Sequence, residues 1–381
     1  MIKFNDLKSQ WLAIKDNAMP EIEELMNNCQ FILGPQVERF EKSFADYCEC
    51  QYAVGVSNGT DGIKIAAKAL EIEHPNLKVY MPANTFVATW LGIKDAYPNS
   101  EIELIDIKED GTMNLDILRS KLEPPRRKPT KPTMYAIGST HVNLVVAVHM
   151  FGNCDNLDEI SQICEETQSF LMEDASQAHG ATTPNGTVAG SKGLVSVFSL
   201  YPGKNLGGCG DAGVIVTNDR DIFRKAKMLR NYGSEQKYIH EFEGFNNRLD
   251  SIQAIVLYWK LKYLDKWNEN RKNFVDKLRN YVDNEYIRWI LSPERGQVYH
   301  ILPIRVENRK LFQQHLDAHN IQHGIHYPIP IHKMPFCDKD FDLPITEMLS
   351  KEMASLPIHP FMTDDDLIKI VGCLNRYKGE N

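Results

Sequence analysis

Short apolar runs alternate with helical patterns between residues 53 and 217, and this alternation constrains the fold more than any other feature. The runs occupy 53–57, 78–82, 101–107, 142–150, 169–174, 195–200 and 213–217. Helical patterns of ten or more residues separate several of them, as in 61–72 and 156–167. This spacing is typical of βαβ units and a mostly parallel sheet, so we predict an α/β fold. Ligands gather where parallel strands end, so residues just after these runs are candidate site residues.

A second unit is predicted after residue 250. The chain has 381 residues, which is more than a single hydrophobic core usually serves. Residues 250–282 form a long helical pattern with few breakers, which we interpret as a connector. We therefore predict a large domain over 1–250, with an N-terminal helical segment. A connecting helix and a smaller C-terminal α/β domain are predicted over 251–381.

Charge, hydropathy and cysteine spacing argue against several classes of partner. A net charge of −8 at pH 7 argues against a nucleic-acid partner. No window has the roughly 20 apolar residues of a membrane span, and the N-terminus lacks the apolar segment of a signal peptide. We expect no membrane partner and a cytoplasmic location. The eight cysteines are scattered without a CxxC pair, so we expect reduced thiols and no metal site.

Lys204 lies just past an apolar run, after Tyr-Pro-Gly, in the stretch FSLYPGKNLGGCGDAG. A lysine at a buried strand end has a depressed pKa, so its amine can attack an aldehyde. Asp174 ends another run and would point into the same crevice. A lone lysine would more often be a surface residue, and a lone aspartate is a common helix cap. The pair favours pyridoxal phosphate (PLP), because its aldehyde takes a lysine and its pyridine nitrogen takes an acid.

The phosphate of such a cofactor would need a third element. The stretch SNGTDG follows an apolar run and opens a helical pattern. Gly59 and Thr60 would therefore present N–H groups at a helix N-terminus, which favours anions. Ser199 precedes Lys204 by five residues and would add a hydroxyl to the same phosphate. Phe86, in PANTF, would stack on the ring.

The order of motifs along the chain resembles the DegT/DnrJ/StrS family of PLP-dependent nucleotide-sugar aminotransferases. The matching motifs are SNGTD, PANTF, EDASQAHGA, FSLYPGKNLGG, RNYG, GFNNRLDSIQA and HYPIPIH. Together with FNDLKSQ near the start, they cover almost the whole chain. The resemblance implies the fold-type I aminotransferase architecture, with a mixed, mostly parallel seven-stranded sheet in the large domain. It also implies a homodimer in which each active site borrows residues from the partner subunit.

The resemblance further implies roles for residues that match the family's motifs. Lys204 would hold the cofactor and carry protons between carbon atoms, and Asp174 would pair with the pyridine nitrogen. Gln177 would lie near the phenolic oxygen of the ring, and Phe86 would cover one ring face. The other implied contacts are Gly59, Thr60 and Ser199 with the phosphate, Asn246 with the phosphate across the dimer interface, and Tyr201, Lys237, His326 and Tyr327 with the sugar.

The implied reaction takes the amino group of L-glutamate to a keto sugar carried on a nucleotide diphosphate. The stretches at 230–250 and 326–332 resemble members that aminate C3 of 3-keto-6-deoxy sugars on dTDP, and we favour that substrate. Amination at C4 of a UDP-, dTDP- or GDP-linked 4-keto-6-deoxyhexose is the alternative. The sequence selects neither the nucleotide nor the configuration of the deoxyamino sugar.

Two other classes of function stay open at this point. A related branch of the family performs dehydration with histidine at the lysine position, and Lys204 argues against it. A non-catalytic regulator with this fold would be expected to have lost the Asp174–Lys204 pair. The chain also departs from the family in two places. Asn156 stands where an acid is usual, and the proline-rich basic stretch at 124–132 is longer than the family norm, which we interpret as a solvated surface loop.

Overall fold

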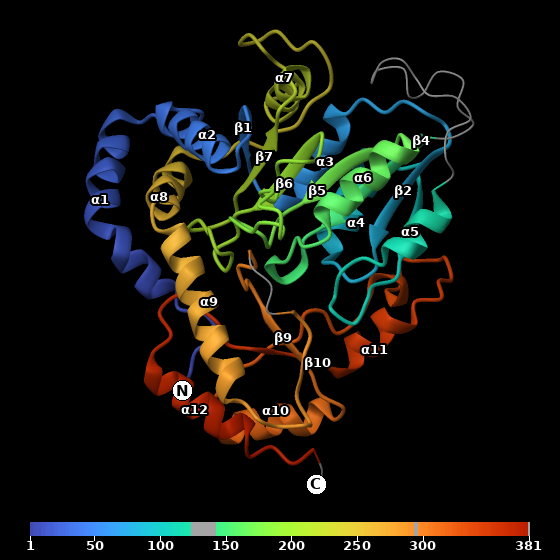
Figure 1. Ribbon diagram of the computed structural model, residues 1–381. Coiled ribbons are helices and arrows are strands. Elements are labelled where there is room, and N and C mark those ends of the chain that lie inside the picture. The colour runs from blue at the N-terminus through green and yellow to red at the C-terminus, as the bar shows by residue number, and fades with distance from the viewer. Residues whose placement is uncertain (123–141, 293–295, 380–381) are drawn as a thin grey trace.

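The computed structural model describes residues 1–122, 142–292 and 296–379. Its larger sheet has seven strands in the order β1-β7-β6-β5-β4-β2-β3 (Figure 1). The strands are β1 Tyr52–Val56, β2 Leu77–Pro82, β3 Glu101–Ile105, β4 Val142–Val148, β5 Phe170–Asp174, β6 Val195–Ser199 and β7 Gly213–Thr217. Strands β2 to β6 pair in parallel, whereas β7 is antiparallel to both β6 and β1. The predicted mixed, mostly parallel α/β sheet is confirmed. The stretch at 124–132 lies outside the described residues.

Strand β4 explains why helices cover both faces of this sheet. Leu144 and Val146 pack in one hydrophobic cluster, and Val145 and Ala147 pack in another. Successive side chains of a strand point to opposite faces, so an apolar run without polar gaps needs cover on both sides. Helices α2 (Pro35–Tyr47), α5 (Leu115–Lys121), α6 (Leu157–Thr167) and α8 (Ser251–Leu261) cover one face, and α3 (Gly59–Ala69), α4 (Val87–Ala96) and α7 (Arg220–Leu229) cover the other.

A small unit fills the lower half of Figure 1. Its antiparallel sheet has the order β10-β9-β8, and its helices share one hydrophobic cluster with that sheet. The elements are β8 Arg288–Trp289, β9 Leu302–Arg305, β10 Met353–Leu356, α9 Leu264–Tyr281, α10 Arg309–Ala318, α11 Pro344–Glu352 and α12 Asp364–Leu374. The start of the chain also lies here, because Ile2 pairs with Ile321 and is buried in the same cluster. The division of the chain at residue 250 stays a prediction.

Two contacts hold the small unit and the N-terminal helix against the large sheet. Asp106, just after β3, accepts hydrogen bonds from the backbone N–H groups of Ile345 and Thr346 at the start of α11. Helix α1 (Leu7–Asn28) packs on α8 through Ile14 and its apolar neighbours. The small unit thus stands over the carboxyl ends of the parallel strands.

Among the described residues, no helix combines the length and apolarity that crossing a bilayer requires.

Candidate active site

The parallel strands end at a cavity of about 860 Å³. The small unit and the first residues of the chain complete its walls. Ten of the residues predicted from the sequence line it: Gly59, Thr60, Phe86, Asp174, Gln177, Ser199, Tyr201, Lys204, His326 and Tyr327. Two others, Lys237 and Asn246, do not. The fold therefore brings most of the predicted residues to one place, although they come from segments almost 270 residues apart in the sequence.

Lys204 is held in this cavity by the tight loop that follows β6. Its backbone N–H donates to Tyr201 O over 2.9 Å, and the loop closes where the N–H of Gly208 donates to Leu200 O over 2.8 Å. A Cβ atom at Gly207 would overlap the carbonyl oxygen of Pro202, so only glycine fits there. The surrounding protein removes water from the amine and lowers the pKa of Lys204 to about 8, while the charge of Asp174 opposes this shift. A proton can therefore leave this amine near neutral pH.

Asp174 is the last residue of β5, and its buried carboxylate is fixed by two donors. Thr89 Oγ1 donates to Asp174 Oδ2 over 2.7 Å, and the backbone N–H of Ser176 donates to Oδ1 over 3.2 Å. Thr85, two residues before α4, places its Oγ1 2.8 Å from Thr89 Oγ1 and extends this set of hydroxyls. Donors on both oxygens hold the carboxylate in one orientation.

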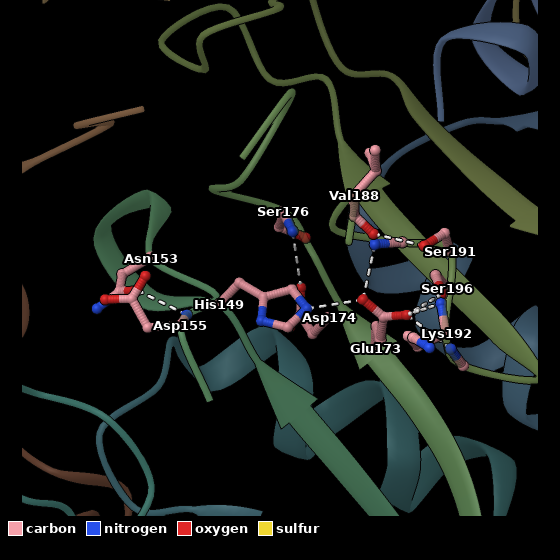
Figure 2. A network of polar contacts seen from close by, with 12 residues as sticks. His149, Asn153, Asp155, Glu173, Asp174, Ser176, Val188, Ser191, Lys192 and Ser196 are labelled. Carbon is pink, nitrogen blue, oxygen red and sulfur yellow. Dashed lines mark hydrogen bonds and ion pairs between the residues drawn. The ribbon is translucent and has the colours of Figure 1, made fainter. Parts of the chain in front are cut away.

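The neighbouring residue Glu173 points to the other side of the strand and forms a separate buried network (Figure 2). Its carboxylate lies 2.8 Å from His149 Nε2, and both side chains are fully buried. The other donors to it are the backbone N–H groups of Gly190, Lys192 and Gly193 and the hydroxyl of Ser196. Burial alone would raise the pKa of Glu173, but these hydrogen bonds, led by that of His149, hold it below its usual range. The network fixes His149, which lines the cavity beside Asp174.

The N-terminus of α3 faces the cavity beside the end of β6. Asn58 caps this helix by accepting a hydrogen bond from the N–H of Asp61 over 2.8 Å. The N–H groups of the first helical turn have no acceptor within the helix, so Gly59 and Thr60 offer donors to an anion. A Cβ at Gly59 would lie 2.7 Å from the Cβ of Ser199. The close approach that brings the Ser199 hydroxyl to this helix end therefore requires glycine.

Aromatic and amide side chains also line the cavity. Gln177 accepts a hydrogen bond from the N–H of Phe151 over 2.7 Å and donates to the Tyr327 hydroxyl over 3.2 Å. The rings of Phe86 and Tyr327 lie 5.1 Å apart. His326 bonds Ser355 Oγ over 2.9 Å, and burial together with the charge of Lys204 lowers the pKa of His326 to about 4. His326 is therefore a neutral hydrogen-bonding group at physiological pH.

A model of the DegT/DnrJ/EryC1/StrS aminotransferase family matches residues 12–375. The chain belongs to this family. A dTDP-3-amino-3,6-dideoxy-alpha-D-galactopyranose transaminase from Aneurinibacillus thermoaerophilus is 35% identical over 380 residues, covering 99% of both chains. A dTDP-3-amino-3,4,6-trideoxy-alpha-D-glucose transaminase from Streptomyces venezuelae is 32% identical over 382 residues, covering 99% of this chain and 96% of the relative. The solved structure of S. venezuelae DesV in complex with a ketimine intermediate has a TM-score of 0.88 at 31% identity, covering 98% of this chain and 97% of that chain.

The DegT/DnrJ/EryC1/StrS family depends on PLP, and this member is a PLP-dependent aminotransferase of nucleotide-linked sugars with the fold-type I architecture. The cavity fits the cofactor on its own geometry. Lys204 supplies an amine with a lowered pKa, and Asp174 supplies a carboxylate held by two donors. The glycine at position 59 lets the start of α3 approach Ser199 closely, so the first N–H groups of the helix and the Ser199 hydroxyl line the same part of the cavity. Lys204 would hold the aldehyde, Asp174 the ring nitrogen, and Gly59, Thr60 and Ser199 the phosphate. These roles remain predictions.

Lys237 and Asn246 lie in the segment 231–249, which follows α7 at the top of Figure 1. Lys237 Nζ sits 5.0 Å from the ring centre of Tyr238, a side chain that is 82% exposed. Asn246 is exposed and pairs with Asn231. Neither residue reaches the cavity of its own chain. This placement agrees with the prediction that Asn246 acts across a dimer interface, which itself stays untested.

Several residues that line the cavity or hold its lining in place were not predicted from the sequence. Thr89 is one helical turn beyond Phe86 in the motif PANTFVAT, and its buried position gives no local signal. His149 directly follows β4, and a polar residue near the end of an apolar run was a usable signal. Asn5 reaches the cavity from the N-terminus and donates to Gly203 O over 3.1 Å. His300 comes from the small unit, and burial, with the charge of Lys204, holds its pKa well below the usual range.

Proposed function

We propose that this enzyme transfers the amino group of L-glutamate to C3 of a dTDP-linked 3-keto-6-deoxyhexose, as a homodimer that shares its active sites. The observation that carries the proposal is that Lys204 and Asp174 line one cavity large enough for a sugar and that the charge of Asp174 acts on the Lys204 amine. The two curated relatives are both named as transaminases of 3-amino sugars on dTDP, which supports C3 and this nucleotide.

The residues of this chain support the proton transfers that amino-group exchange needs. When bound, PLP supplies an electron sink that makes a proton on the nitrogen-bearing carbon acidic. Lys204 Nζ would take that proton and return it to another carbon, because an amine with a pKa of about 8 both accepts and releases protons near neutral pH. Asp174 would hold a proton on the ring nitrogen, because Thr89 and Ser176 keep its carboxylate oriented.

The charge of the cavity supports a shared active site. L-glutamate carries two carboxylates and the sugar nucleotide carries a diphosphate, and such anions bind best to lysine or arginine. Lys204 is the only lysine or arginine among the described residues that line the cavity. The buried histidines at 300 and 326 are neutral because their pKa values are lowered. We infer that Lys237, which is exposed within the segment 231–249, supplies a positive charge to the partner's cavity.

Supplying the enzyme with ¹⁵N-labelled L-glutamate tests the position of amination. The purified enzyme is incubated separately with a dTDP-linked 3-keto-6-deoxyhexose and with the 4-keto isomer, and the new C–N bond is located by NMR. The expected result is ¹⁵N on C3 and faster turnover of the 3-keto sugar. Label on C4 with the 3-keto sugar unreacted would overturn the C3 assignment and select the C4 alternative. No label on either sugar would contradict the proposed reaction and favour a regulator.

A further inference from the structure

The small unit contains two histidines and one cysteine that have no part in the cavity described above. His315 lies in α10, His319 caps the C-terminal end of that helix, and Cys373 lies in the last turn of α12. One ring nitrogen of each histidine and the sulfur of Cys373 lie within 4.8 Å of one another. The two rings are 4.5 Å apart between centres. Histidines four residues apart lie on one face of a helix, where they can share a ligand.

Both imidazole rings are tethered to backbone carbonyls. His315 Nε2 donates to Cys373 O over 2.9 Å, and His319 Nδ1 donates to His315 O over 2.8 Å. A neutral imidazole that donates from one nitrogen carries its lone pair on the other. Histidines that bind metals in proteins generally make such a bond, which fixes the ring and strengthens it as a ligand. Tyr377 packs on the His315 ring at 5.5 Å and further restricts it.

We propose that His315, His319 and Cys373 bind one zinc-type ion in the small unit. Imidazole and thiolate are the ligands that Zn²⁺ prefers, and they discriminate against Mg²⁺ and Ca²⁺, which take oxygen. Cys373 is fully buried and both histidines are half-buried, so the cysteine forms the floor of the site and water completes a tetrahedron from the open side. Ligand distances of about 2.0–2.3 Å require the three atoms to approach by roughly 1 Å.

The ion would join the C-terminal ends of two helices that are distant in the sequence. His315 and Cys373 are 58 residues apart, and the packing of α10 on α12 in one hydrophobic cluster brings them together. A ligand that binds the folded state alone stabilises it, so the ion would stabilise the small unit. The thiol of Cys373 releases its proton to solvent on binding. This proposal replaces the expectation of no metal site. That expectation was based on the spacing of cysteines alone, which gives no information about histidines on another helix.

Direct metal binding to the tag-free holoenzyme tests the site. Zn²⁺ is measured by equilibrium dialysis with elemental analysis, and its ligands are identified by X-ray absorption. We expect one tightly bound equivalent, with a Zn–S distance of about 2.3 Å and Zn–N distances of about 2.0–2.1 Å. Co²⁺ in place of Zn²⁺ should give the visible bands of a four-coordinate thiolate complex, at longer wavelengths than the cofactor absorbs. Absence of a bound equivalent, or a shell of oxygen and nitrogen without sulfur, would overturn the proposal.

Matched variants assign the ion to these side chains. His319→Gln and Cys373→Ser should each weaken Zn²⁺ binding by at least about tenfold, because each removes one of three protein ligands. His74→Gln and Cys29→Ser, which change the same residue types elsewhere, should bind the ion like the parent protein. His319 is half-buried, so its variant remains informative even if the variant at the buried Cys373 fails to fold. Unchanged affinity in His319→Gln would refute the site.

Discussion

Thr89 donates its hydroxyl hydrogen to Asp174 Oδ2 over 2.7 Å, and both side chains are buried. The donor comes from α4 and the acceptor from β5, 85 residues later in the chain. A hydrogen bond to a carboxylate stabilises its charged form and fixes its orientation. The orientation of the Asp174 carboxylate therefore depends on a helix that packs on the sheet next to the cavity, as well as on the strand that carries it.

Replacing Thr89 by valine should lower kcat/KM by roughly 10- to 100-fold, because a hydrogen bond to a charged group contributes about 1.5–3 kcal/mol. Steady-state kinetics with glutamate and the keto sugar measure the loss. Thr89→Ser keeps the hydroxyl and should retain most of the activity. A valine variant with the kcat/KM of the parent enzyme would show that Thr89 does not position Asp174.

Lys204→Ala should abolish turnover, because no other lysine or arginine among the described residues lines the cavity. Asp174→Asn should lose most activity while still binding the cofactor, because the amide fills the same space without the charge. Kinetics and the absorption spectrum of each variant provide the measurement. Borohydride reduction of the parent holoenzyme should modify Lys204, as seen by mass spectrometry. Appreciable turnover by the alanine variant, or an unmodified Lys204, would refute the assignment.

Gly59→Ala should weaken cofactor binding, because its Cβ would lie 2.7 Å from the Cβ of Ser199 and push the start of α3 away from that hydroxyl. The dissociation constant, titrated by fluorescence, should rise by at least about tenfold, the equivalent of one charge-assisted hydrogen bond. Gly372→Ala is the control, because its Cβ would meet only the flexible Arg376 side chain, at 3.7 Å. Equal cofactor affinity in the two variants would contradict the proposed phosphate site.

Mixed dimers of Lys204→Ala and Asn246→Ala chains test the shared site. If Asn246 serves the partner's cavity, a mixed dimer has one intact site, because the chain that keeps Lys204 receives Asn246 from its partner. Random mixing makes half of the dimers mixed, so activity should return to about a quarter of the parent level. Each variant alone, refolded in the same way, provides the baseline. Activity no higher than that baseline would place Asn246 at its own chain's site.

Lys260 should make stability depend on pH above neutrality. Its amine is buried and donates to Gly207 O and Gln10 Oε1, and burial lowers its pKa from 10.5 to about 8. Between these two values the unfolded chain keeps a proton that the folded chain has lost. The free energy of unfolding should therefore rise as the pH increases from about 8 to 10.5 and fall as the pH decreases toward 8.

Urea unfolding of the parent protein and of Lys260→Met at several pH values in this range measures that dependence. The methionine variant should show a smaller rise with pH, because it has no proton to exchange. Lys262→Met is a suitable control, because Lys262 is the exposed C-cap of the same helix, two residues further along the chain. An identical pH dependence in the Lys260→Met variant and the parent would show that the buried amine is not the titrating group.

Local sequence patterns were sufficient to predict the mostly parallel sheet and the main chemical groups of the site. Apolar runs separated by helical patterns predicted parallel strands, and the residues at or just after the ends of those runs include Asp174 and Lys204, which both line the cavity. Glycine at position 59 was predicted as part of an anion site, and its close approach to Ser199 explains why no larger residue fits. These features could be predicted because strand ends and helix starts are set by residues close together in the sequence.

The sequence by itself determined which groups stand at the strand ends: an amine at 204, a carboxylate at 174 and a glycine-based helix start at 59. Only the tertiary structure decided that the hydroxyl of Thr89 would meet Asp174, and that His315 would meet Cys373. The physical reason is the distance along the sequence over which each kind of interaction acts. Hydrophobic periodicity and turn chemistry act within a few residues, whereas contacts between distant segments depend on strand order and on how whole helices pack.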